Sequence, residues 1–141
     1  MKKNDFVLKK IVKILFPILL VYVGYIQFYG EESPGGGFQS GLVLTYLFVL
    51  YKVFFNHNKK IKVSFFLKIA AYGVLLYFFT GFISIFYGGF FLDYLYFSKN
   101  NVISRHIGVF IVELGVFLAV FSSMTSIFLI FYDFFKENTN E

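Results

Sequence analysis

The chain has 141 residues, of which 58% are hydrophobic and 24% aromatic, and its formal net charge is +5 at pH 7. This much apolar surface exceeds what the core of a small water-soluble domain can bury, so the composition excludes an ordinary soluble protein and indicates a lipid bilayer. The chain contains no cysteine, which excludes disulfides and thiolate metal sites. The lysines cluster at the ends of apolar segments, a pattern that indicates membrane topology and not nucleic-acid binding.

Four apolar segments in succession predict an all-α integral membrane protein with four transmembrane helices, because a span needs roughly 20 apolar residues. The approximate spans are residues 11–29, 34–55, 66–92 and 107–132, within a single domain that covers residues 1–141. The first segment carries one charge, Lys13, near its end, where a lysine side chain can reach the interface. A signal peptide is the alternative for this segment, but no small-x-small cleavage site follows it.

The basic residues predict the orientation, since Lys- and Arg-rich short loops stay in the cytoplasm. Of the thirteen, eleven fall on one predicted side and two, Lys99 and Arg105, on the other. The eleven are Lys2, Lys3, Lys9, Lys10, Lys13, Lys52, Lys59, Lys60, Lys62, Lys68 and Lys136. Both termini are therefore expected in the cytoplasm, with the turn at 31–37 and the loop at 93–104 outside.

The turn reads "GEESPGGGFQSG", residues 30–41. Ser33 suits an N-cap and Pro34 a first helical residue, so the second helix is expected to begin at Pro34. Gly37 and Gly41 then lie one turn apart, and Gly36 and Ser40 extend a small-residue face that lets another helix approach closely. Two adjacent acidic residues precede the helix and either form an outer mouth that attracts cations or simply favour the positive end of the helix dipole. They are Glu31 and Glu32.

Glu113 is the only carboxylate well inside a predicted span, and such a residue is by default a candidate for function. It either handles ions or protons or makes a buried structural hydrogen bond. His106 lies two turns earlier on nearly the same face, as a second ion-path candidate or an interfacial residue. Hydroxyls further along either continue a polar stripe inward from the outer surface or, as we expect, bond to the backbone carbonyl four residues back. They belong to Ser122, Ser123, Thr125 and Ser126.

The sequence contains no arrangement that predicts a self-contained enzyme, a metal site or a cofactor site. "GGGFQSG" lacks the Gly-Lys-Ser/Thr ending of a phosphate-binding loop, and there is no catalytic set of paired acids or of nucleophile and base. His57 and His106 fall on opposite membrane faces in the predicted topology, too far apart to share a metal. Broad apolar helix surfaces without an internal repeat favour a subunit of a larger assembly.

Two motifs carry a resemblance to the B subunit of multisubunit Mrp-type Na⁺/H⁺ antiporters, the MnhB family. Residues 14–44 resemble the start of that subunit through a Pro-Gly-Gly-Gly-Phe signature, although Ser40 replaces one of a second pair of glycines typical of the family. The signature residues are Pro34, Gly35, Gly36, Gly37 and Phe38, followed by Gln39, Ser40 and Gly41. Residues 105–120 resemble the fourth-helix pattern of the family through Glu113, Leu114, Gly115 and Val116. Relatives often have a histidine next to the glycine before the signature, whereas this chain has Glu31 after Gly30.

The resemblance implies a small multi-pass subunit in the plasma membrane of a bacterium or archaeon. Its partners would be the other antiporter subunits and membrane lipid, and the complex would exchange cytoplasmic Na⁺, or another monovalent cation, for external H⁺. It implies no cofactor and no nucleic acid. The alternatives are a B-like subunit of a related ion-translocating membrane-bound hydrogenase, or a scaffold subunit that touches no ion.

Overall fold

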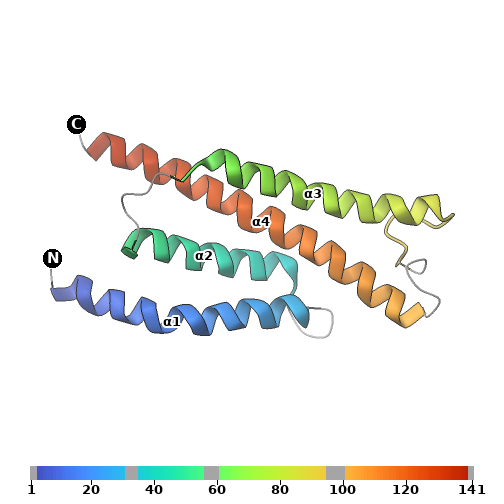
Figure 1. Ribbon diagram of the computed structural model, residues 1–141, viewed down its shortest axis with the longest axis horizontal. Coiled ribbons are helices and arrows are strands. Elements are labelled where there is room, and N and C mark those ends of the chain that lie inside the picture. Colours follow the sequence, from blue (N-terminus) through green and yellow to red (C-terminus); the bar gives the residue numbers. More distant parts are fainter. Residues whose placement is uncertain (1–2, 31–34, 56–60, 95–100, 140–141) are drawn as a thin grey trace.

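The computed structural model describes residues 3–30, 35–55, 61–94 and 101–139, and this part of the chain is all-α (Figure 1). The helices are α1 (Lys3–Phe28), α2 (Gly37–Phe55), α3 (Val63–Phe86) and α4 (Asn101–Thr139). The long α4 runs through the middle, with α3 on one side and α2 and α1 on the other (Figure 1). The beginning of α1 and the end of α4 lie at the same end of the molecule (Figure 1).

Three of these helices are long and apolar enough to cross a membrane: α2, α3 and the part of α4 from Val102 to Lys136. They overlap three of the four predicted spans. The helix at the first predicted span, α1, is 26 residues long, contains Pro17 and carries Lys9, Lys10 and Lys13 in its first half.

The start of α2 differs from the prediction, because the helix begins at Gly37 and not at Pro34. Gly36 has a φ of +120°, which a residue with a side chain rarely adopts, and its carbonyl accepts the first helical hydrogen bond from Ser40 N–H at 3.1 Å. Gly36 therefore caps the helix, a role that the sequence suggested for Ser33. Ser33 and Pro34 lie outside the described residues. The remaining 19 residues give a helix of about 28 Å.

The end of α3 also differs, because the helix stops at Phe86, well before the predicted limit at residue 92. Gly88 has a φ of +86° and its N–H donates to the Ile85 carbonyl at 2.9 Å, while the Gly89 N–H donates to the Ser84 carbonyl at 3.0 Å. These two bonds form a Schellman cap, which requires a left-handed residue and is therefore set by the glycine pair. Apolar composition alone did not reveal this stop.

The connection into α4 folds back onto the bundle. Ser104 donates a hydrogen bond to the carbonyl of Tyr94, and the ring of Tyr94 occupies the space beside Gly108. Burial raises the pKa of Tyr94, because the phenolate loses hydration, and the neighbouring Tyr77 adds to the effect. α4 begins at Asn101, inside the segment predicted as a loop from 93 to 104.

Glycines bring α3 and α4 together at the middle of the bundle. A Cβ on Gly73 would lie 2.6 Å from the carbonyl oxygen of Gly115, and one on Gly115 would lie 2.9 Å from that of Gly73. Val116 lies beside this crossing and lines a small apolar cavity there. Gly115 and Val116 of the fourth-helix motif therefore belong to the contact with α3.

Candidate functional site

The glycine-rich turn and the fourth-helix motif meet at Glu113. A Cβ on Gly36 would lie 3.2 Å from Oε1 of Glu113, and a Cβ on Gly30 would lie 2.8 Å from Oε2. The carboxylate thus rests against the backbone of the turn, where Gly30 and Gly36 also approach each other closely: a Cβ on Gly30 would lie 2.6 Å from Cα of Gly36. The structure joins two motifs that the sequence presented separately.

The contact continues along α2 and α4, as the Gly-xxx-Gly spacing predicted. A Cβ on Gly37 would overlap the carbonyl oxygen of Glu113, and one on Gly41 would lie 3.0 Å from that of Phe117. One turn further, the Thr45 hydroxyl, which donates to the Gly41 carbonyl at 2.9 Å, also lies 3.3 Å from the Phe121 carbonyl oxygen. Successive turns of the two helices therefore meet in the same order, so α2 and α4 run parallel and in direct backbone contact.

The other residues of the signature face elsewhere. Gly35 lies against Ile26 of α1, where a Cβ would come within 2.9 Å of Cγ2. Phe38 is exposed. Ser40 was expected to extend the small-residue face toward another helix, and its buried hydroxyl lies 2.6 Å from Oε1 of Gln27 on α1. The signature therefore packs α2 against both α1 and α4.

A polar cavity lies beside the carboxylate, between α1 and α4. Its volume is about 180 Å³, and its lining confirms that His106 and Glu113 share a face. It is lined by Gln27, Phe28, His106, Val109, Phe110 and Glu113. The rings of Phe28 and Phe110 stack with centroids 5.7 Å apart, so they join α1 to α4 at the edge of the cavity. A carboxylate in such a cavity can take up or release a proton or a cation.

The sequence reasoning missed Gln27, although it is the one amide in the first apolar segment. Glu31 and Glu32, the acidic candidates for an outer mouth, lie outside the described residues. Nothing in the structure tests their role.

Further along α4, the hydroxyls only partly follow the prediction. Ser123 bonds to the Ala119 carbonyl at 2.6 Å and Ser126 to the Ser122 carbonyl at 2.8 Å, each four residues back as expected. Ser122 and Thr125 differ, because their buried hydroxyls have no hydrogen-bond partner in the described part of the chain. The prediction is wrong for these two residues.

Lys52 was counted from the sequence as a topology marker, but its side chain is only 2% exposed. Its Nζ lies 5.5 Å from the centroid of the Tyr132 ring on α4, within the range of a cation–π interaction. A buried cation therefore lies between α2 and α4, near the end of α2 that is farthest from Glu113.

Comparison with known proteins identifies the family. Residues 7–126 match the family model described as "Domain related to MnhB subunit of Na+/H+ antiporter". A protein of Staphylococcus epidermidis named "Putative antiporter subunit mnhB2" is 34% identical over 92% of this chain and 95% of its own length. A protein of the same name from Staphylococcus haemolyticus is 31% identical over the same shares. One from Staphylococcus aureus is 43% identical over 40% of each chain. The chain therefore belongs to the family of domains related to the MnhB subunit of Na⁺/H⁺ antiporters.

Proposed function

We propose that this chain is a small membrane subunit of a multisubunit Na⁺/H⁺ antiporter, and that Glu113 takes part in the exchange. The observation that carries the proposal is the position of the Glu113 carboxylate, held against Gly30 and Gly36 at the edge of a polar cavity. A carboxylate within a membrane-spanning helix is expensive to bury, and such residues mark ion and proton pathways. The names of the relatives favour an antiporter over the hydrogenase alternative.

In the proposed topology α1 crosses the membrane as well as α2, α3 and α4, and both termini are cytoplasmic. Residues 11–28 of α1 carry one charge, Lys13, and are long enough for a span. The start of α1 and the end of α4 lie at the same end of the molecule, and α1 runs away from that end (Figure 1). This arrangement fits a bacterial plasma membrane, with the lysine-rich end inside and the cavity in its outer half.

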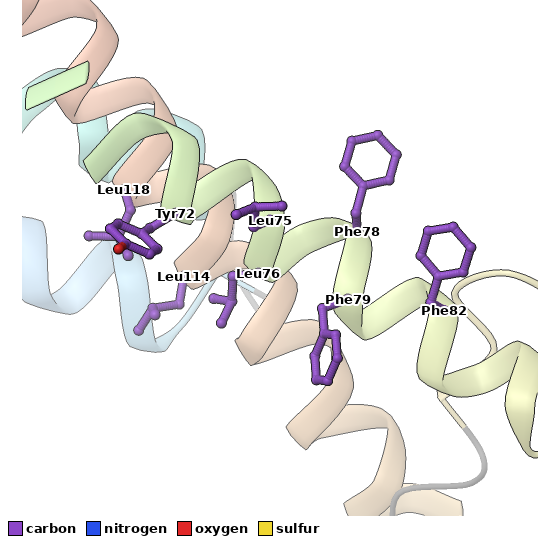
Figure 2. A pocket seen from close by; sticks show the side chains of 8 residues that line it. All are labelled: Tyr72, Leu75, Leu76, Phe78, Phe79, Phe82, Leu114 and Leu118. Atoms are coloured by element: carbon purple, nitrogen blue, oxygen red, sulfur yellow. The ribbon is translucent and has the colours of Figure 1, made fainter. Parts of the chain in front are cut away.

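The exposed apolar side chains along α3 support the proposal that the chain is a subunit of a larger complex. A cavity of about 590 Å³ lies along α3 and α4 and is lined almost wholly by apolar side chains (Figure 2). Phe78 and Phe82 project away from α4, and Phe79 is 66% exposed (Figure 2). Lipid and the other subunits of the complex are the partners that suit this surface.

Membership of the complex is tested by copurification. The chain, carrying a C-terminal epitope tag, is expected to bring down the other antiporter subunits from mild detergent, and its deletion is expected to abolish Na⁺-dependent proton movement in everted vesicles. Restoring the gene provides the control. A tagged chain that purifies alone, from cells whose exchange survives its deletion, contradicts the proposal.

A further inference from the structure

Gln27 is a buried polar side chain to which the proposed function gives no role. It is 7% exposed, on α1, and it lines the same cavity as Glu113. With Oε1 facing Ser40, its Nε2 has no hydrogen-bond partner in the described part of the chain. A buried amide nitrogen without a partner costs about 1–3 kcal/mol, so this orientation of the amide is unfavourable.

The hydrogen-bond acceptors around Ser40 favour the opposite orientation of the Gln27 amide. The Ser40 hydroxyl has one hydrogen but lies within reach of three acceptors: Gln27 Oε1 at 2.6 Å, the Gly36 carbonyl at 3.0 Å and the Gly37 carbonyl at 3.1 Å. The oxygen and nitrogen of an amide have nearly the same shape, so the bonding decides which is which. If the amide is turned over, Nε2 donates to Ser40 Oγ, and Ser40 donates to a carbonyl of its own helix. The Gln27 nitrogen and the Ser40 hydroxyl then both have a partner, and the amide oxygen takes the position that has none in the described part of the chain.

The turned amide presents its oxygen to the cavity. The lining then offers an amide oxygen from Gln27 and a carboxylate from Glu113, the ligand types that hard cations prefer. The volume of about 180 Å³ holds an ion together with several waters, each of which takes about 30 Å³.

We propose that the Gln27–Glu113 cavity binds a partly hydrated monovalent cation, for which Na⁺ is the probe. A monovalent cation follows from the proposed function, since the matching family model is described as related to a subunit of a Na⁺/H⁺ antiporter. The proposal rests on the proposed function and extends it by assigning the cation to this cavity and a ligand role to Gln27.

The test is the Na⁺ dependence of exchange by the purified complex in proteoliposomes, at constant ionic strength. Gln27→Leu keeps the approximate size and removes the ligand, so the half-saturating Na⁺ concentration is expected to rise about tenfold while the maximal rate changes little. Gln39→Leu is the matched control, because Gln39 is exposed on α2, and it is expected to leave the half-saturating concentration unchanged.

Gln27→Glu decides the matter if the leucine variant does not assemble. At an alkaline pH that keeps both carboxylates ionised despite their mutual repulsion, the second carboxylate is expected to lower the half-saturating Na⁺ concentration several-fold. The cation site is contradicted if the half-saturating Na⁺ concentration is unchanged or raised in Gln27→Glu, or is unchanged in an assembled Gln27→Leu complex. The cavity would then hold only water. If these variants behave like wild type while Glu113→Gln stops exchange, this inference fails and the proposed function stands. If Glu113→Gln exchanges normally, the proposed function itself fails.

Discussion

Replacing Gly37 with alanine forces α2 and α4 apart. A Cβ at this position would overlap the carbonyl oxygen of Glu113, and it would lie 2.8 Å from the carbonyl carbon of Glu113 and 3.0 Å from the nitrogen of Phe117. These are backbone atoms, so no side-chain rotation relieves the overlap. Because carbon atoms pack best at about 3.5–4.0 Å, α4 has to retreat by roughly 1 Å. Overpacking of this kind costs about 1–3 kcal/mol.

Two other glycines provide graded controls. A Cβ on Gly41 would meet the Phe117 oxygen at 3.0 Å and the Phe121 nitrogen at 3.2 Å, so Gly41→Ala needs a shift of only a few tenths of an ångström. Gly24, inside α1, has nothing within 4 Å of its Cβ position. Gly24→Ala is therefore expected to be neutral or to stabilise α1 by up to about 1 kcal/mol.

The assay is the apparent melting temperature of the detergent-solubilised protein, together with the amount of assembled complex on native gels. The expected order of stability is Gly24→Ala at or above wild type, then Gly41→Ala, then Gly37→Ala. If Gly37→Ala is as stable as Gly24→Ala, the two backbones do not meet as described and the close-packing argument is wrong.

Two further predictions concern topology and the buried lysine. Because the chain has no cysteine, a single cysteine at Glu32 is expected to react with an impermeant external thiol reagent and one at Asn138 is not; the reverse pattern refutes the orientation. Lys52→Ala is expected to cost about 2 kcal/mol, since it leaves a void and removes the ammonium from the Tyr132 ring. Lys68→Ala, at an exposed position on α3, is expected to leave the melting temperature unchanged, and equal effects of the two variants contradict a structural role for Lys52.

Residue spacing along one helix could be read from the sequence. The separation of Gly37 and Gly41 predicted a close helix contact, and both glycines lie against the backbone of α4. The separation of His106 and Glu113 predicted a shared face, and both residues line one cavity. Such inferences succeed because the helical repeat alone determines which residues of one helix lie together. The bounds of the helices were harder to predict, because they depend on backbone conformations at Gly36 and Gly88 that composition does not reveal.

The partners across helices could not be predicted from spacing. The glycine turn meets Glu113 because α2 and α4 run side by side in one particular offset, and a sequence pattern does not contain that offset. The place of Gln27 could not be predicted for the same reason, because Gln27 contacts Ser40, which lies on a different helix. Lys52 was misjudged because its place near a span end suggests an interfacial lysine, whereas its side chain turns inward to Tyr132.

The central claim is that Glu113 takes part in the exchange and is not only a packing residue. Gln at this position keeps the shape and hydrogen-bonding capacity but removes the charge and the titratable proton. The direct measurement is Na⁺-dependent proton movement in everted vesicles that contain equal amounts of assembled wild-type, Glu113→Asp and Glu113→Gln complex. We expect Glu113→Gln to assemble normally and lose most of the exchange, and Glu113→Asp to retain part of it. Normal exchange by a fully assembled Glu113→Gln complex contradicts the claim and makes the subunit a scaffold.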